Sequence, residues 1–180
     1  MKITRRLNRK AFAAAVVKQL KKYEISAVLV GGACVSIYTN ERHASHDLDF
    51  ISPQAHEKIE QALAEIGFKR KNNSYKHIDS DFYVEFPSGP VAIGNEVPVK
   101  PDGGFTYRGT QVQMLSPTQS VMDRLSAWYH WSDHGSLINA ILICESQPVN
   151  LDKVRRWSKL EGEEKKYEQF LIDLKTNKKK

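Results

Sequence analysis

Apolar positions in the first part of the chain follow two different periods, one typical of helices and one of strands. Phe12, Val16, Leu20 and Tyr23 are spaced as in an amphipathic helix that packs on a core. The short apolar run at residues 26–30 contains β-branched side chains and stops at two glycines, which is typical of a strand followed by a tight turn. The two periods together predict helices packed against a sheet.

The following segment repeats this mixture. Residues 33–38 have helical character, and residues 46–52 alternate polar and apolar side chains as a strand does. Ser52 suits the N-cap of a helix and Pro53 its first residue, so we expect a helix over residues 54–66. A helix between two strands argues against an all-β fold.

The remaining pattern predicts more strands and then only helices. We expect strands at residues 75–78, 81–86, 91–97, 105–108 and 110–115. From Ser116 the pattern becomes helical, because Ser116 and Gln119 match the capping box that begins a helix. The expected helices cover residues 117–131, 137–145, 151–160 and 163–175. The fold class is therefore α/β (α+β), with a mixed β-sheet flanked by helices in residues 1–115 and a C-terminal helical region in residues 116–180.

Chain length and cysteine content narrow the class of protein. With 180 residues the chain can hold one domain with a hydrophobic core, or a compact domain with a helical appendage. Its two cysteines, Cys34 and Cys144, cannot form a disulfide framework, so we expect two small buried side chains in a reducing, cytoplasmic setting. No segment has the uninterrupted apolar length that a membrane span needs, so we expect no membrane contact.

The net charge of +6 is unevenly distributed along the chain. Residues 1–22 hold eight basic and no acidic side chains, residues 151–180 have a net charge of +4, and residues 23–150 have a net charge of −6. Basic ends favour a polyanion such as RNA as a partner, and an acidic middle suits bound cations. We expect the lysines at residues 178–180 to be only a solvated tail.

Two aspartates provide the first candidate for chemistry. Asp47 and Asp49 lie two apart in an expected strand, so their side chains leave the same face with Cα atoms about 7 Å apart. Two carboxylates so placed repel unless a divalent cation lies between them, and oxygen ligands suit Mg²⁺ or Mn²⁺. Glu85 could join them from a neighbouring strand, with Asp81 in reserve, and three carboxylates could hold two metal ions around a phosphoryl displacement. A solvated strand edge is the alternative interpretation.

The two glycines provide the second candidate. Gly31 and Gly32 end a strand and open a helix, so they would present backbone N–H groups to the phosphates of a nucleoside triphosphate (NTP). A tight turn alone would also explain them. Arg42, Ser45 and His46 precede the acidic strand and could contact phosphate or a second substrate, or belong to a solvated loop.

The order of these residues resembles a known family. In chain order the motif is Val30, Gly31, Gly32, Arg42, Ser45, His46, Asp47, Leu48, Asp49 and Phe50. It is similar to the signature of the DNA-polymerase-β-like nucleotidyltransferases in its Gly-Gly form, especially the branch of abortive-infection toxins from bacterial toxin–antitoxin systems and their uncharacterised relatives. The resemblance covers about the first three quarters of the chain.

The resemblance implies roles for individual residues. Gly31 and Gly32 would bind nucleotide phosphates, Asp47 and Asp49 would ligate Mg²⁺, and Glu85 would take the third carboxylate position. That third position is commonly Asp in the family, and the frequent Gly-Ser is Gly-Gly here. The toxin branch also uses a Lys and an Asp in its helical part, for which Arg124 and Asp133 are only loose counterparts. As such a counterpart, Arg124 would contact the nucleotide phosphates.

Three functions remain open at this point. The first is a Mg²⁺-dependent nucleotidyltransferase acting on an acceptor hydroxyl of RNA (such as tRNA), a protein or a small molecule, within a toxin–antitoxin system. The second is a non-catalytic module of the same fold that acts as an antitoxin or regulatory partner. The third is an RNA-binding protein that uses its basic ends. A zinc site at His130 and His134 is disfavoured, because helical His pairs without further ligands are more often structural.

Overall fold

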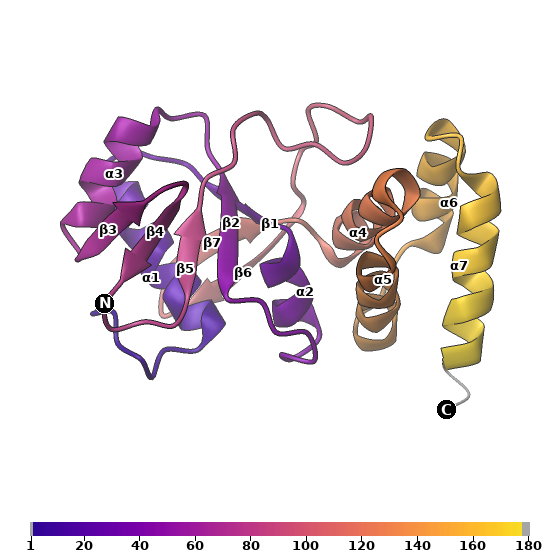
Figure 1. Cartoon of the computed structure of the whole chain (residues 1–180), viewed down its shortest axis with the longest axis horizontal. Helices are drawn as coiled ribbons and strands as arrows, with labels where there is room; N and C mark the ends of the chain where they lie inside the picture. Colours follow the sequence, from indigo (N-terminus) through magenta and orange to yellow (C-terminus); the bar gives the residue numbers. More distant parts are fainter. Residues whose placement is uncertain (1, 178–180) are drawn as a thin grey trace.

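A computed structural model of the protein describes residues 2–177, in which a mixed sheet and seven helices form the fold (Figure 1). The strands are β1 (Val28–Val30), β2 (Asp47–Ile51), β3 (Phe68–Lys71), β4 (Ser74–His77), β5 (Tyr83–Glu85), β6 (Gly103–Tyr107) and β7 (Thr110–Met114). The helices are α1 (Arg9–Lys22), α2 (Gly32–Tyr38), α3 (His56–Ala64), α4 (Pro117–Trp131), α5 (His134–Ser146), α6 (Leu151–Leu160) and α7 (Glu164–Asn177). The predicted α/β fold class is confirmed.

The seven strands lie in the order β3-β4-β5-β2-β1-β7-β6. The β2–β5 and β1–β7 pairs are parallel, and the other pairs are antiparallel. In the register of the central strands, Asp49 lies opposite Val30 of β1 on one side and Glu85 of β5 on the other. The two acidic strands are therefore direct neighbours in the middle of the sheet.

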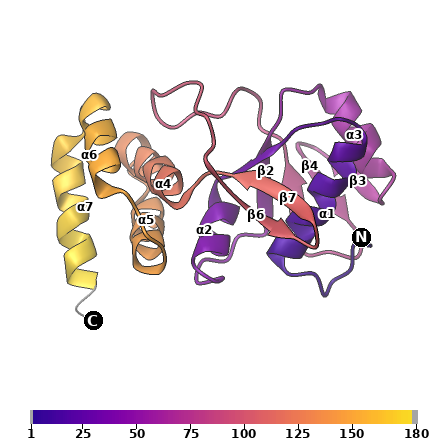
Figure 2. The same cartoon turned by 180° about the vertical axis from the view of Figure 1, so that it is seen from behind.

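Alternation along the central strands gives the sheet two different faces. Leu29, Leu48, Phe50 and Val84 are fully buried, and they share the face on which α1 and α3 lie (Figure 2). The residues between them, including both aspartates of β2, are only half-buried. One face thus carries the core, and the other is left accessible to ligands.

Helix α1 is a core helix, as its apolar spacing predicts. Its residues from Ala11 to Val17 are all buried, and even Arg9 is only 3% exposed. The basic residues near the N-terminus are therefore divided between the core and the surface, with Lys18 and Lys22 among the exposed ones.

The C-terminal helices begin with a strong cap. The Ser116 hydroxyl accepts a hydrogen bond from the Gln119 backbone N–H, and the Gln119 side chain accepts one from the Ser116 backbone N–H, so the predicted capping box is confirmed. Gln119 is buried and also donates to the carbonyl of Lys100, which ties the preceding loop to α4. Helices α4 and α5 contact α2, whereas α6 and α7 lie farther from the sheet (Figure 1).

Two local predictions were wrong, and one strand was not predicted. Residues 91–97 form a loop with a single bridge between Ile93 and Glu96 instead of a strand. Strand β3 was missed, because only Phe68 in its charged sequence is buried. Ser52 does not cap a helix: its hydroxyl donates to the Ser26 carbonyl and accepts from the Gln54 N–H, and α3 begins only at His56.

Two other expectations concern the cysteines and the ends of the chain. Cys34 is fully buried, as predicted, whereas Cys144 is half-buried. The expected tail at residues 178–180 lies outside the described residues. Within residues 2–177, none of the helices has the length and apolar character to cross a membrane.

The buried face predicts a large effect of truncation. Leu48→Ala should lower the free energy of unfolding by about 3 kcal/mol, because it opens a cavity beneath the acidic strand. Leu160→Ala is the matched control, because Leu160 is 85% exposed and its loss should cost less than about 0.5 kcal/mol. Urea unfolding measures both, and equal effects of the two substitutions would contradict the assigned faces.

Candidate active site

The candidate site is built on three carboxylates of the accessible sheet face. Asp47 and Asp49 alternate with buried residues along β2, and parallel pairing sets Glu85 of β5 opposite Asp49. Tyr83 lies opposite Asp47 in the same register. Since paired residues of parallel strands share a face, all four side chains leave the sheet on the same side.

The carboxylates influence one another's charge. The pKa of Asp49 is raised from 3.8 to about 6, mainly by burial and also by the negative charges of Asp47 and Glu85. Arg124 of α4 acts in the opposite direction and is not sufficient to cancel them. The face therefore has an excess of negative charge that a cation would relieve.

The oxygen-only donor set fits Mg²⁺ or Mn²⁺. In the part of the chain that the structure describes, no three His, Cys, Asp or Glu side chains are already gathered into a metal-binding group. Mg²⁺ does not require such a group, because it keeps several waters and binds through one or two carboxylates together with substrate phosphates. Asp47 and Asp49 satisfy this requirement, and Glu85 is their neighbour.

The Gly31–Gly32 turn lies directly against the acidic strand. Gly31 has φ of +69°, and a Cβ atom there would lie 2.8 Å from Asp49 Oδ2. A Cβ atom on Gly32 would lie 3.2 Å from Ser45 Oγ and 3.4 Å from His43 Nε2. Gly31 is thus required by both its backbone conformation and its close approach to Asp49, whereas a side chain at Gly32 would be tightly packed against Ser45 and His43.

Loop residues 41–45 are held in place by a buried arginine. Arg9 of α1 donates to the Ser45 carbonyl and forms a 2.7 Å ion pair with Glu41. The Ser45 hydroxyl in turn donates to the Asp47 carboxylate. This chain of contacts runs from the core helix to the first candidate metal ligand, so Arg9 and Ser45 position Asp47.

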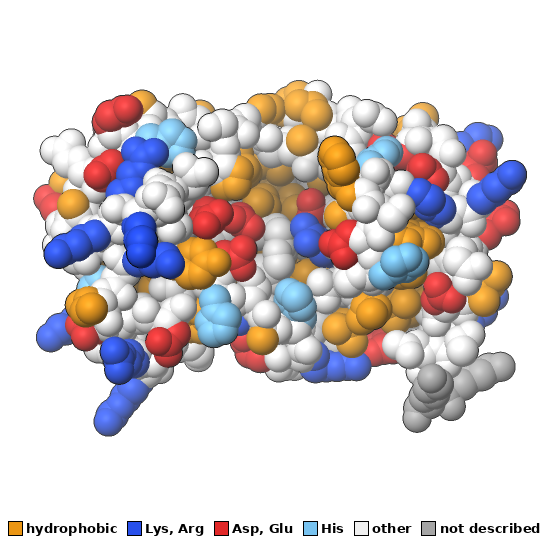
Figure 3. Space-filling view, viewed as in Figure 1, with side chains coloured by type: hydrophobic (Ala, Val, Ile, Leu, Met, Phe, Trp, Pro, Cys, Tyr) orange, Lys and Arg blue, Asp and Glu red, His pale blue; other side chains and the backbone are white. Residues whose placement is uncertain are grey.

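Arg124 faces the acidic strand from the helical region. Burial alone would lower the pKa of Arg124, but Asp123, which pairs with it at 2.7 Å, raises it. The positive charge of Arg124 acts to lower the pKa of Asp49. Burial lowers the pKa of His43, and the charge of Arg124 lowers it further. Figure 3 shows a hollow between the sheet and the C-terminal helices, with acidic side chains on its sheet side. The positive charge of Arg124 therefore offsets part of the negative charge around Asp49.

Other predicted residues lie in different surroundings. Arg42 forms a 2.9 Å ion pair with Glu145 of α5, and His46 is exposed beside Phe82. Asp133 caps α5, and hydrogen bonds from Ser136 lower its pKa. The phosphate contacts expected of Arg42 and Arg124 remain predictions, and the placement of Asp133 indicates a structural role.

Asp81, His130 and His134 lie outside the paired segment of β2 and β5. Asp81 lies exposed in the turn before β5. His130 contacts Glu161 at 3.0 Å, and His134 is the exposed first residue of α5. Glu85 is therefore the carboxylate that joins the aspartates.

Sequence reasoning missed two residues near the site. His43 lies beside Gly32. Besides burial, the charge of Arg124 lowers the pKa of His43 and the charge of Asp47 raises it. Arg9 holds the loop that contains His43. No local period marks either residue, although His43 follows Arg42 within the motif that the sequence singled out.

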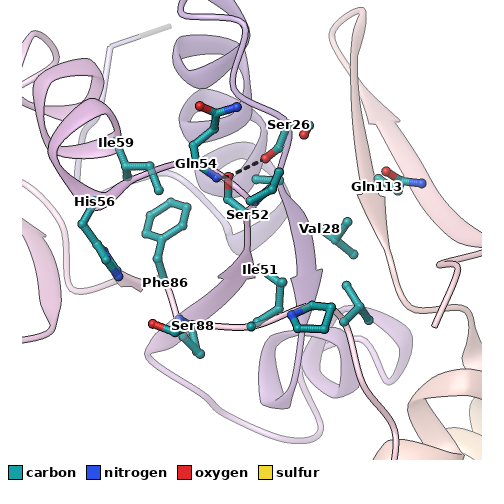
Figure 4. Close-up of a pocket in the computed structure, with 16 residues that line it drawn as sticks. Ser26, Val28, Ile51, Ser52, Gln54, His56, Ile59, Phe86, Ser88 and Gln113 are labelled. Atoms are coloured by element: carbon teal, nitrogen blue, oxygen red, sulfur yellow. Dashed lines mark hydrogen bonds between the residues drawn. The ribbon is translucent and has the colours of Figure 1, made fainter. Parts of the chain in front are cut away.

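A cavity of about 510 Å³ extends the accessible face away from the glycine turn (Figure 4). Val28 and Ile51 lie opposite each other at its floor, and Ile51 is two residues beyond Asp49. Around the rim the Ser52 hydroxyl donates to the Ser26 carbonyl. Lys, Arg, Asp and Glu are all absent from its lining, which belongs entirely to the described residues. The cavity is thus neutral, unlike the acidic site next to it.

Comparison with solved structures identifies the fold. A crystal structure of an antigenic nucleotidyltransferase-like protein from Paracoccidioides brasiliensis matches with a TM-score of 0.56 and 15% identity, over 78% of this chain and 77% of that one. The chain has a nucleotidyltransferase-like fold. A solution structure of the antibiotic-resistance factor ANT(2'')-Ia matches with a TM-score of 0.52 and 11% identity, over 93% of this chain and 97% of that one. No protein-family model and no curated protein sequence matches the chain.

The raised pKa of Asp49 predicts how stability depends on pH in this nucleotidyltransferase-like fold. The folded protein binds the Asp49 proton more tightly than the unfolded chain, so stability should fall as pH rises from about 4 to about 6. Without divalent cations, Asp49→Asn should raise the free energy of unfolding by about 1–2 kcal/mol at neutral pH, after allowance for solvent screening, and by almost nothing near pH 4. Urea unfolding at both pH values measures this. Asp79→Asn, in an exposed turn, is the control and should change little.

The glycine turn gives a second prediction. Gly31→Ala should weaken nucleotide binding and lower stability, because its Cβ would collide with the Asp49 carboxylate in addition to straining the backbone. Gly109→Ala has a similar φ of +76° but open space around the new Cβ, so it carries the strain without the collision. Calorimetric titration with Mg²⁺ and an NTP should show a loss of binding only for Gly31→Ala. Equal behaviour of the two variants would argue against a site at this turn.

Proposed function

We propose that this protein is a Mg²⁺-dependent nucleotidyltransferase that moves a nucleoside monophosphate from an NTP to an acceptor hydroxyl. The proposal rests mainly on the shared sheet face of Asp47, Asp49 and Glu85 beside the Gly31–Gly32 turn. The nucleotidyltransferase-like fold supports it, because the solved structures named above share this arrangement of sheet and helices.

Each group has a distinct task in this proposal. Asp47 and Asp49 hold Mg²⁺ or Mn²⁺, and Glu85 is the third carboxylate. The bound ion would supply positive charge that stabilises phosphate oxygens and aligns them for in-line displacement. The backbone of Gly31 and Gly32 takes the outer phosphates of the NTP.

The transfer is a balanced substitution at phosphorus. The acceptor oxygen forms a bond to the α-phosphorus while the bond from that phosphorus to the bridging oxygen breaks. Pyrophosphate leaves with the bonding electrons, and the hydroxyl proton passes to Glu85 or to water. In-line geometry requires the acceptor oxygen and pyrophosphate to lie on opposite sides of the α-phosphorus.

The wider setting of the reaction is also part of the proposal. We propose a cytoplasmic location, which the cysteine usage supports, and an RNA acceptor such as tRNA, which the basic ends of the chain support. A cognate toxin or antitoxin partner is proposed from the sequence resemblance alone. A non-catalytic antitoxin or regulatory module would keep the fold but would not need a working carboxylate triad.

Label transfer tests the proposed activity directly. Full-length protein is incubated with each NTP labelled at the α-phosphate, with Mg²⁺, and with total RNA or cell extract as the acceptor source. We expect labelled acceptor, with transfer reduced roughly a hundredfold or more in Asp47→Asn and Asp49→Asn, because each removes charge that holds the cation. Asp152→Asn, at an exposed position of α6 away from the sheet, is the control and should keep full activity.

Two outcomes would rule the activity out. One is the absence of label transfer with every NTP and acceptor source. The other is transfer that persists undiminished in Asp47→Ala. Binding of a partner protein without any Mg²⁺-dependent nucleotide binding would instead support the non-catalytic module.

A further inference from the structure

The strand register places basic side chains on the same face as the carboxylates. Asp47 of β2 lies opposite Tyr83 of β5, Tyr83 lies opposite Lys76 of β4, and Lys76 lies opposite Lys69 of β3. These four residues form one row across the sheet. Since paired residues share a face, the two lysines and the tyrosine project on the side of the candidate active site.

The neighbouring row repeats the pattern. Asp49 lies opposite Glu85, Glu85 lies opposite Ser74, and Ser74 lies opposite Lys71. We name Lys69, Lys71, Lys76 and Tyr83 the lysine platform. Figure 3 shows Lys and Arg side chains gathered over β3 and β4, beside the acidic side chains over the central strands.

The platform lines a hollow rather than a flat surface. Its volume is about 860 Å³, and all four platform residues contribute to its lining together with His46, Phe82 and the 83% exposed Ile78. Asp81 also lines the hollow, and among the described residues it forms no ion pair with the platform lysines. The ammonium nitrogen of Lys76 lies 5.0 Å from the centroid of the Tyr83 ring. A cation and an aromatic ring are therefore available side by side, next to Asp47.

The platform lysines are not engaged with acids. In the described residues none of the three forms an ion pair, whereas Arg70, which alternates to the opposite face, pairs with Glu60. All three lysines are exposed. Their charge is thus available to an anionic ligand.

The position of the platform determines which substrate it can serve. In the strand order, the carboxylates of β5 and β2 lie between Lys76 on β4 and Gly31 at the end of β1. The proposed function places the leaving pyrophosphate at Gly31 and Gly32, so in-line displacement brings the acceptor from the opposite side. That side is the lysine platform.

We propose that the lysine platform binds the acceptor and that the acceptor is a single-stranded polynucleotide. Three lysines match consecutive backbone phosphates, and Tyr83 provides a ring on which a terminal base stacks. The terminal hydroxyl of the strand is the attacking group in the substitution described above. This inference rests on the proposed nucleotidyl transfer, but it assigns binding to the β3–β4 side instead of the basic ends of the chain.

Binding of labelled oligonucleotides tests the platform separately from catalysis. Fluorescence anisotropy is measured for the full chain with single-stranded RNA and with DNA of the same mixed sequence, without NTP, over a series of salt concentrations. The platform variant Lys69→Gln/Lys71→Gln/Lys76→Gln should bind at least about tenfold more weakly near 0.1 M salt. The slope of log affinity against log salt should become shallower by about 2, because three phosphate contacts are lost.

The control removes the same charge elsewhere. Lys18→Gln/Lys22→Gln/Lys165→Gln changes three exposed lysines of α1 and α7, and its affinity should stay within about twofold of the unsubstituted protein. Tyr83→Leu should weaken binding by roughly tenfold, and Tyr83→Phe should retain it, because stacking needs only the ring. Unchanged Mg²⁺-dependent NTP binding in the platform variant shows that it is folded and that the platform does not hold the triphosphate.

The outcomes separate this inference from the proposed function. An equal loss of oligonucleotide affinity in both triple variants, or no loss in either, would overturn the proposed role of the lysine platform. Label transfer to a protein or small molecule, with no oligonucleotide binding, would overturn it while leaving the nucleotidyltransferase intact. Platform-dependent binding without any label transfer would support the surface and refute the activity. Preference for RNA or for DNA would identify the kind of strand.

Discussion

The parallel pairing of β2 with β5 is the constraint on which the candidate site depends. It sets Glu85 beside Asp49, with Asp47 two residues away on the same face. Carboxylates at this spacing repel, and burial adds to the cost, as the raised pKa of Asp49 shows. A proton or a cation relieves the repulsion, but a proton is largely lost at neutral pH when the pKa is about 6. The divalent cation of the proposed function would relieve this repulsion at neutral pH.

The surrounding structure holds this unfavourable arrangement in place. Leu48 and Val84 anchor the acidic strands through their fully buried face. Arg9 reaches from the core helix to the Ser45 carbonyl, and a buried acceptor left without such a donor would cost about 1–3 kcal/mol. Gly31 allows the chain to turn against Asp49 without a side chain in the way. The buried contacts on the core face thus offset the repulsion between the carboxylates on the accessible face.

The sequence alone was sufficient to predict those structural features that neighbouring residues define. The alternation of β2 and the capping box at Ser116 were readable because neighbouring residues define them. Strand β3 could not be predicted in this way, because its charged residues pair at the exposed edge of the sheet and only Phe68 is buried in the core. Arg9 was counted among surface charges, since its contacts lie more than thirty residues away in sequence. The same limit applies to the platform: its lysines become neighbours of Asp47 only through the register of four strands.

In the proposed reaction, that register would also constrain the order in which the two substrates bind. The lysine platform and the Gly31–Gly32 turn lie on opposite sides of the carboxylates, and each is proposed to hold a phosphate-bearing substrate. Between them the face carries the charges of Asp47, Asp49 and Glu85, which repel both anions at the point where they must meet. Positive charge on the lysines could hold a polynucleotide nearby, but the nearest lysine, Lys76 on β4, is separated from β2 by β5. A cation arriving with the triphosphate would remove this barrier, so the nucleotide is expected to bind before the acceptor end reaches the α-phosphorus.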